Sequence, residues 1–288
     1  MRPRIIGAAG SVEIMSLCTV IVATYRGQHL GETLTSVLEQ THEELEILVL
    51  DDASEERCRL LVKGLGDERL RYLSNETPLG VALNHQKGLD EARGQFISIV
   101  NHDDRIAPDV LSTLIAALEA EPSAAAAFAP PHVMDVTGRD RPDRTAFAWR
   151  QWGMDGIPTG LIEKWTDVSP LIGFQSIASV VYRRAAVDRI PRQVGGSYDT
   201  WMAYRAIRRS SVIHVPEAVG HWREHPDNLT LRRSWRRTYE VAYLNGRVAL
   251  DTAMPVKFRA RSMLKCLRAL AATVFDRFVR GQRVIARP

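Results

Sequence analysis

The chain has 288 residues, 45% of them hydrophobic and 25% charged, which is enough for one large or two small domains with a sizeable core. Its formal net charge of +4 is too weak to indicate nucleic-acid binding, so no nucleic-acid partner is expected. The 3 cysteines lie far apart without C-x-x-C spacing, which argues against a zinc site or a disulfide framework and favours a cytoplasmic protein.

The two ends of the chain differ in composition from the middle. Residues 1–14 carry two arginines and a short apolar stretch that Glu13 interrupts, so we expect a loose leader and no secretory signal. No uncharged run approaches the roughly 18 residues of a membrane-spanning helix. We therefore expect a leader over 1–14, an α/β domain over 15–230 and a basic helical extension over 231–288.

The first half of the chain alternates between strand and helix patterns. Apolar runs predict strands over 17–24, 45–50, 69–74, 95–100 and 124–136. Helical spacing predicts helices over 32–40, 55–63, 80–93 and 108–120. Such alternation predicts a mostly parallel central sheet flanked by helices.

The middle of the chain has a less regular pattern. Residues 138–173 contain Trp149, Trp152 and Trp165 among several glycines, and we expect a long irregular loop that is either functional or anchored to the core by its tryptophans. Further on, the pattern predicts a strand over 175–184, a helix over 198–208 and a short strand over 211–216.

The C-terminal region is basic and helical in pattern. An apolar stripe recurs along it, with most of the arginines and lysines off the stripe. Apolar helix faces usually serve the core, so we expect this one to pack on its own domain. A peripheral contact with an anionic membrane is the alternative left open. The stripe consists of Met263, Leu267, Leu270, Val274 and Phe278.

Polar residues follow three of the predicted strands directly, at Thr24-Tyr25, Asp51-Asp52 and Asp103-Asp104. In a parallel sheet these ends share one edge, which is where open α/β sheets bind ligands. The first turn lacks the G-x-G-x-x-G signature, which argues against a dinucleotide-dependent oxidoreductase or a methyltransferase. A nucleotide would have to be held there in another way.

Four polar groups could carry chemistry, and the first three also have a simpler structural explanation. Asp103 and Asp104 could hold Mg²⁺ or Mn²⁺ and through it a diphosphate, or they could form a solvated loop before a helix. Asp52 could accept the N–H of a pyrimidine base, or cap a turn. Asp199 could take a proton from a hydroxyl, or stabilise a helix N-terminus. Arg223 and His225 could contact phosphate, and His225 could also bind the metal.

Taken in order, four segments resemble the family 2 glycosyltransferases of the GT-A fold. They are "TVIVATYRGQHLGETLTSVLEQTHEELEILVLDDAS", "NETPLGVALNHQKGLDEARGQFISIVNHDDRIAPDVL", "SYDTWMAYR" and "REHPDNLT", and the likeness covers about residues 17–230. The resemblance implies a Rossmann-like, mostly parallel sheet flanked by helices. It also implies transfer of a sugar from a nucleotide-diphosphate sugar to an acceptor hydroxyl with inversion.

The resemblance implies a role for each matching residue. Thr24 and Tyr25 would lie at the base, with Tyr25 stacked on it, and Asp52 would bind the base. Asn84 would lie in the helix that passes the donor. Asp199 would be the general base, and Arg223 and His225 would close over the diphosphate. The metal ligands would be Asp104, expected to be the more direct one, with Asp103 and His225.

The partners follow from the same likeness. The donor would be UDP-, dTDP- or GDP-linked and the cofactor a divalent cation, Mn²⁺ or Mg²⁺. The acceptor would be a glycan, a lipid-linked glycan or a small molecule, in the cytoplasm or at the inner face of the membrane. The sequence departs from the family pattern at Asn101, Tyr198 and Arg26. The first two departures leave open a non-catalytic module that binds a nucleotide-sugar or a glycan.

Overall fold

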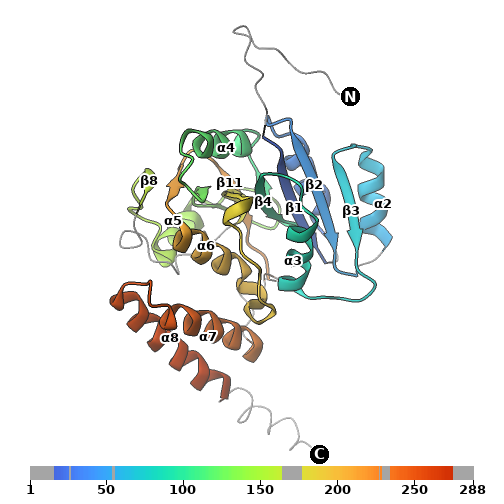
Figure 1. Ribbon diagram of the computed structural model, residues 1–288. Coiled ribbons are helices and arrows are strands. Elements are labelled where there is room, and N and C mark those ends of the chain that lie inside the picture. The colour runs from blue at the N-terminus through green and yellow to red at the C-terminus, as the bar shows by residue number, and fades with distance from the viewer. Residues whose placement is uncertain are drawn as a thin grey trace, which may run out of the picture.

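The computed structural model describes residues 16–25, 27–53, 56–163, 177–226, 228 and 234–274. Within these residues, an 8-stranded sheet has the order β3-β2-β1-β4-β9-β6-β10-β8 and carries helices on both faces (Figure 1). Its strands are β1 (Cys18–Thr24), β2 (Leu45–Asp51), β3 (Leu70–Ser74), β4 (Phe96–Asn101), β6 (Ala126–Phe128), β8 (Gly160–Ile162), β9 (Val180–Arg183) and β10 (Val212–His214).

The sheet is mostly parallel, as predicted. Strands β3, β2, β1 and β4 run parallel to one another, and β9 is antiparallel to both of its neighbours, so β6 and β10 point the same way as β1. Strand β8 is antiparallel to β10 at the sheet edge. A second, 3-stranded sheet has the order β5-β11-β7 in the described part of the chain. Its strands are β5 (Arg105–Ile106), β7 (His132–Met134) and β11 (Gly220–Arg223).

The helices cover both faces of the sheet because the buried strands are apolar at consecutive positions and so present apolar side chains to both faces. On β1, Ile21 faces one core with Trp201, whereas Val20 and Val22 face another with Leu114. The helices are α1 (Leu30–Leu38), α2 (Glu56–Leu65), α3 (Val81–Glu91), α4 (Val110–Ala120), α5 (Pro142–Trp152), α6 (Tyr198–Arg209), α7 (Trp235–Leu250) and α8 (Val256–Val274). The described residues also contain three 3₁₀ turns: η1 (Ile177–Ser179) and η2 (Arg184–Ala186) flank β9, and η3 (Arg192–Ser197) leads into α6.

Two predictions for the middle of the chain are wrong. Residues 138–173 were expected to be irregular, but Pro142 to Trp152 form α5. Proline is favoured in the first turn of a helix, and Gly153 ends α5 in the left-handed conformation. The single strand expected over 124–136 is two strands, β6 and β7, in different sheets. Pro130 and Pro131 separate them because proline cannot donate to a strand ladder. Trp165 and residues 175–176 lie outside the described residues.

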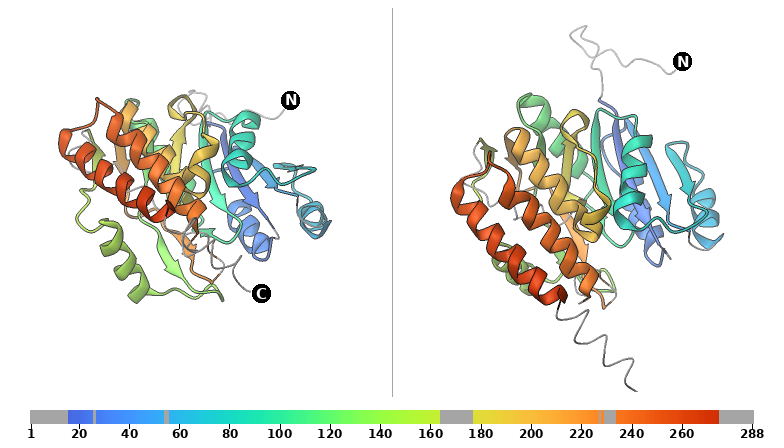
Figure 2. Two further views of the ribbon diagram at one scale, coloured as in Figure 1. Left: turned by 90° about the horizontal axis from the view of Figure 1, so that it is seen from below. Right: turned by 60° about the horizontal axis from the view of Figure 1, so that its bottom comes forward.

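The C-terminal helices α7 and α8 pack side by side, with α7 between α8 and the body of the protein (Figure 2). Leu244 and Val248 of α7 share the core that contains Trp201. Asp251, just after α7, accepts a hydrogen bond from the Tyr204 hydroxyl at 2.6 Å. The hairpin is therefore built onto α6 by both apolar and polar contacts. Among the residues described, no helix is both long and apolar enough to cross a membrane.

The expected packing of the C-terminal apolar stripe on its own domain is wrong where the structure describes it. Met263, Leu267 and Leu270 are 39%, 56% and 43% exposed. Helix α8 instead turns a different face inward, which includes Phe258 and Ala269. The side chain of Val274 and all of Phe278 lie outside the described residues.

Candidate functional site

The polar ends of β1, β2 and β4 lie side by side at one edge of the sheet. Thr24 is in register with Asp51 of β2, and Ala23 with Asn101 of β4. The Asp52 backbone N–H donates to the Thr24 carbonyl at 3.0 Å, which continues the ladder past the strand ends. The predicted convergence of the three polar motifs at one edge is therefore confirmed.

Asp52 holds the segment between β3 and α3. Its carboxylate accepts the backbone N–H of Leu79 at 2.7 Å and of Gly80 at 2.9 Å, and the side-chain amide of Asn75 at 3.0 Å. Asn75 also donates to the Asn84 side-chain oxygen at 2.9 Å. Both Asp52 and Asn84 are buried. Asn75, which links two of the predicted site residues, carried no signal in the sequence.

Next to Asp52, the end of β1 presents one inward and one outward side chain. The Thr24 hydroxyl is buried and has no hydrogen-bond partner in the described part of the chain. A buried polar atom without a partner is costly, so a ligand that pairs with it would be favoured. Tyr25 is half exposed at the surface of the same edge.

Asp104 points into the protein. It is fully buried, and its two carboxylate oxygens accept hydrogen bonds from the Arg223 backbone N–H at 3.0 Å and the Asn101 side-chain amide at 3.2 Å. Burial, together with the neighbouring Asp103 carboxylate, raises the pKa of Asp104 well above its usual range. Asp104, expected as the more direct metal ligand, thus faces the β11 backbone.

Asp103 points the other way, toward His225. The His225 Nε2 atom lies 2.9 Å from an Asp103 carboxylate oxygen, and both side chains are partly exposed. Burial opposes ionisation of Asp103, but the His225 hydrogen bond acts together with the charges of His102 and His225 to lower the pKa of the carboxyl. The described residues contain no cluster of three or more His, Cys, Asp or Glu side chains able to hold a metal. Asp103 and His225 form a hydrogen-bonded pair at the rim.

Arg223 is a buried organising residue. Its guanidinium is fully buried and donates to the Asp103 carbonyl at 2.8 Å, the Val136 carbonyl at 3.0 Å and the Glu32 carboxylate at 2.6 Å. Its backbone N–H donates to Asp104. We expected Arg223 to contact a diphosphate. In this conformation its buried side chain instead contacts the backbone of the loop that follows β4. Glu32, its ion-pair partner on α1, carried no signal in the sequence.

Two of the three departures from the family pattern, Tyr198 and Asn101, contact each other. The Tyr198 hydroxyl donates to the Asn101 side-chain oxygen at 2.8 Å, and Asn101 in turn donates to Asp104. The Tyr198 ring stacks on His85 of α3 with ring centroids 3.8 Å apart. Burial lowers the pKa of His85 to about 4, so the ring is neutral at neutral pH. Tyr198 thereby connects α6 and α3 to the end of β4.

Asp199 follows Tyr198 in the first turn of α6. One of its carboxylate oxygens accepts the backbone N–H of Thr200 at 2.6 Å and the Thr200 hydroxyl at 3.2 Å. Burial raises the pKa of Asp199, and the charge of Arg237 on α7 acts in the opposite direction. The charges of Asp199, Asp103 and Asp104 all act on the Tyr198 hydroxyl, whose pKa is raised chiefly by burial. The three acidic groups are therefore close enough to one tyrosine hydroxyl for their charges to act on it.

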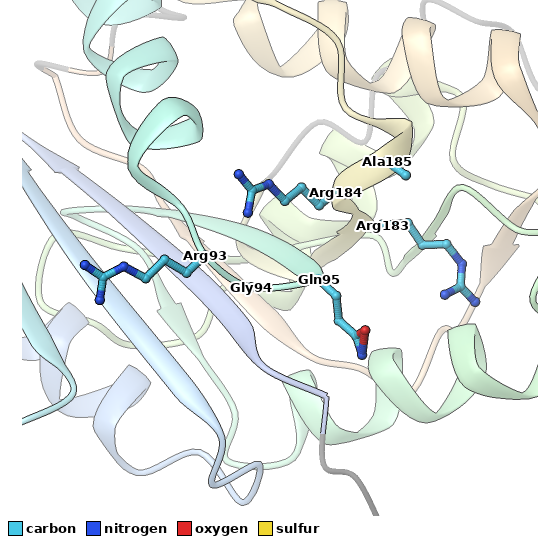
Figure 3. Close-up of a pocket in the computed structure, with 6 residues that line it drawn as sticks. All are labelled: Arg93, Gly94, Gln95, Arg183, Arg184 and Ala185. Carbon is cyan, nitrogen blue, oxygen red and sulfur yellow. The ribbon is translucent and has the colours of Figure 1, made fainter.

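A separate hollow of about 650 Å³ lies at the opposite end of β4, lined by Arg93, Gln95, Arg183 and Arg184. Figure 3 shows the guanidinium groups of Arg93 and Arg183 directed away from each other. Arg183 donates to the Ala124 carbonyl at 2.9 Å, beyond the end of α4. Because the cations diverge, this hollow does not form a convergent anion site.

Solved structures with a similar fold include two complexes with nucleotide-sugars. S. aureus TarS 1-349 with UDP-GlcNAc gives a TM-score of 0.65 at 16% identity, over 91% of this chain and 76% of that one. The mannosyltransferase PcManGT from Pyrobaculum calidifontis, with GDP-Man and Mn²⁺, gives 0.62 at 19% identity, over 91% of this chain and 76% of that one. The fold is therefore GT-A.

Sequence comparison identifies the family. A glucosyltransferase of Escherichia coli, WfgD, whose name gives UDP-Glc as donor and an α-D-GlcNAc-diphosphoundecaprenol as acceptor, is 35% identical over 89 residues, 31% of this chain and 35% of that protein. The chain matches only just over a third of the length of the first curated relatives, with 37%, 35% and 34% of them covered. The model of glycosyl transferase family 2 matches residues 19–191, more than half of the chain. The chain belongs to glycosyl transferase family 2.

Proposed function

We propose that this protein transfers a sugar from a nucleotide-diphosphate sugar to an acceptor hydroxyl with inversion at the sugar carbon. The observation that carries the proposal is the hydrogen-bonded connection from Tyr198 through Asn101 to Asp104. It fixes the start of α6, and with it Asp199, against the acidic loop that follows β4. A proton acceptor and a group able to hold a diphosphate thereby share one rim.

The donor base would lie at the ends of β1 and β2. The buried Thr24 hydroxyl would gain a partner there, and the half-exposed Tyr25 ring offers a stacking surface. Asp52 would form the floor of this subsite, because its carboxylate already fixes the backbone N–H groups of Leu79 and Gly80. UDP-, dTDP- and GDP-linked donors all fit this description.

Asp103 and His225 fit a divalent cation. Mg²⁺ is usually held by one or two carboxylates, with waters and substrate phosphates completing its shell, so a two-residue site suffices when the donor is bound. Carboxylate oxygen suits Mg²⁺ and Mn²⁺, and histidine nitrogen is a common ligand of transition-metal ions. A cation held there would offset the negative charge on the departing diphosphate. Arg223 would help to hold Asp103 in place, because its guanidinium donates to the Asp103 carbonyl and its backbone N–H donates to the neighbouring Asp104 carboxylate.

Asp199 would act as the general base. Its pKa is raised by burial, which improves its ability to take a proton at neutral pH. The acceptor oxygen would attack the sugar carbon on the side opposite the diphosphate as Asp199 removes its proton. Single displacement from that side inverts the configuration. The lipid-linked acceptor and UDP-Glc donor in the name of the WfgD relative support a role in polysaccharide or glycoconjugate synthesis near a membrane.

The variant Asp199→Asn tests the general base. We expect kcat to fall by a factor of about 10²–10⁴, the usual contribution of a positioned base, while donor affinity stays close to wild type. The control is Asp155→Asn, which removes an exposed carboxylate elsewhere. Turnover of Asp199→Asn within twofold of wild type would show that the base is another group.

Thermal shift with nucleotide-sugars tests the donor and the metal. A ligand that binds only the folded state raises its stability by about 2.7 kcal/mol at a concentration 100 times its Kd. We expect at least one of the UDP-, dTDP- or GDP-sugars to raise the melting temperature more with Mn²⁺ than without it. The Asp103→Asn variant should lose this Mn²⁺-dependent part. An equal shift with and without Mn²⁺ in both proteins would contradict the metal assignment.

A further inference from the structure

Helix α8 has three distinct faces. Phe258, Ser262 and Ala269 are buried against the rest of the protein. A second face is apolar but exposed, and its members recur at intervals of three and four residues, which places them on one side of the helix. We call this face the α8 apolar stripe. It consists of Val256, Ala260, Met263, Leu264, Leu267 and Leu270.

The third face of α8 is basic. Lys257, Arg261, Lys265 and Arg268 are exposed and lie next to the α8 apolar stripe. Helix α8 contains no acidic residue, and none of the four cations forms an ion pair with a carboxylate in the described part of the chain. An exposed apolar stripe bordered by unneutralised cations is the pattern of a helix that lies in a membrane interface.

We propose that α8 binds the surface of an anionic lipid membrane and lies parallel to it. The α8 apolar stripe would enter the boundary between headgroups and acyl chains, and the four cations would contact lipid phosphates. Charge complementarity favours this occupant over a second copy of the chain. Two acid-free helices packed on each other would bring like charges together without any carboxylate to offset them.

Because of where α8 lies, binding of α8 to a membrane would also affect the candidate site. Helix α8 lies on the outside of the molecule, with α7 beneath it (Figure 2). Helix α7 in turn contacts the segment before Asp199: Glu240 accepts the Gly196 backbone N–H at 3.1 Å, and Arg237 donates to the Ser197 hydroxyl at 2.6 Å. A membrane-bound hairpin would hold this rim near the lipid surface. This last step rests on the proposed function, whereas membrane binding itself does not.

Co-sedimentation of the full chain with lipid vesicles tests the proposal. Vesicles of neutral phosphatidylcholine are compared with vesicles that contain one quarter phosphatidylglycerol, at low and at high salt. We expect binding to the anionic vesicles, weakened by salt, and little binding to the neutral ones. Equal binding to both kinds of vesicle, or to neither, would overturn the proposal.

Two variants separate the basic and apolar parts. The triple variant Arg261→Gln, Lys265→Gln, Arg268→Gln should bind anionic vesicles about 100-fold more weakly at low salt, at roughly fivefold for each cation. Its control, Arg57→Gln, Arg139→Gln, Arg192→Gln, removes the same charge from exposed positions elsewhere and should bind like wild type. Equal losses in the two triple variants would show that net charge alone is responsible, against a site on α8.

The double variant Leu264→Ser, Leu267→Ser should also lose binding, with an unchanged circular dichroism spectrum because both side chains are exposed. Should wild type instead be a dimer that this variant dissociates, with no vesicle binding in either, the stripe would be a self-association face and the proposal wrong. The inactive Asp199→Asn variant should bind vesicles normally. Membrane binding would thus still hold if the transferase proposal failed, and the transferase proposal would still hold if membrane binding failed.

Discussion

The hydrogen bond between Tyr198 and Asn101 should be measurable as a coupling free energy. The variant Tyr198→Phe removes only the hydroxyl that donates to the Asn101 side-chain oxygen at 2.8 Å. The ring, its burial and its stack on His85 remain. What changes is one polar contact at the point where α6 meets the end of β4.

The expected size follows from the surroundings. A typical hydrogen bond contributes about 0.5–1.5 kcal/mol net, and a buried acceptor left without a partner costs about 1–3 kcal/mol. Asn101 is only partly buried, so water can replace part of the lost bond. We therefore expect Tyr198→Phe to lower the free energy of unfolding by about 1–2 kcal/mol. Asn101→Ala should cost more, because it also removes the donor to Asp104.

Urea unfolding of wild type, Tyr198→Phe, Asn101→Ala and the double variant gives the coupling directly. We expect the two losses to be non-additive by about 1 kcal/mol, since each single variant breaks the same bond. The exposed Tyr239 supplies a control, because Tyr239→Phe should change stability by less than about 0.5 kcal/mol. Losses that add within about 0.3 kcal/mol would refute the claim that these two residues act together.

Two further predictions concern the same region. Gly195 has φ +48, and a Cβ there would lie 1.9 Å from a Glu240 carboxylate oxygen, so Gly195→Ala should lower unfolding free energy by about 2 kcal/mol in the same assay. Gly64 in α2 has open space around it, and Gly64→Ala should raise the free energy of unfolding by up to about 1 kcal/mol. A loss of stability in Gly64→Ala, or no loss in Gly195→Ala, would contradict this reasoning. Burial lowers the pKa of His85 to about 4, so the folded state disfavours the charged ring. The contribution of neutral His85 to the free energy of unfolding should be complete above pH 6.5 and fall by about 3 kcal/mol as the pH drops toward 4. Stability curves for wild type and His85→Phe should diverge over that pH range, and parallel curves would show that His85 is not the titrating group.

The sheet and its polar edge could be predicted because their signals are local. Each central strand is an apolar run that ends in polar residues, and parallel pairing then brings those ends together without further information. Helix α5 was missed although its proline start and glycine end are also local. The glycines and tryptophans around it suggested a loop, and that composition outweighed the two boundary signals.

The contacts that organise the site could not be predicted, because they join residues far apart in the chain. Arg223 and Glu32 form a hydrogen bond although they are 191 positions apart in the sequence, and Tyr198 and Asn101 do so at a separation of 97 positions. A sequence motif shows that an arginine is present but not whether its guanidinium faces a ligand or the interior. Burial of Arg223 depends on α1 and the loop after β7 closing around it, which is tertiary information.

Helix α8 shows why periodicity alone misjudges which face is buried. Its buried face includes Ser262 and Ala269, which are less apolar than the exposed Leu264 and Leu267. Small residues let two helices approach closely: a Cβ at Gly246 of α7 would lie only 3.4 Å from the Cys266 sulfur of α8. The buried face of α8 therefore combines Phe258 with small side chains, while Leu264 and Leu267 stay exposed.

Asp103 and Asp104 are adjacent, yet the structure gives them different tasks. Asp104 is fully buried, accepts hydrogen bonds from β11 and from Asn101, and has a raised pKa, so it joins the two sheets rather than facing a ligand. Asp103 has a lowered pKa and meets His225 at the rim. A cation needs an ionised oxygen ligand that it can reach. Of the two carboxylates, Asp103 is the one that satisfies both conditions in this conformation, and the Arg223 guanidinium supports it by donating to the Asp103 carbonyl.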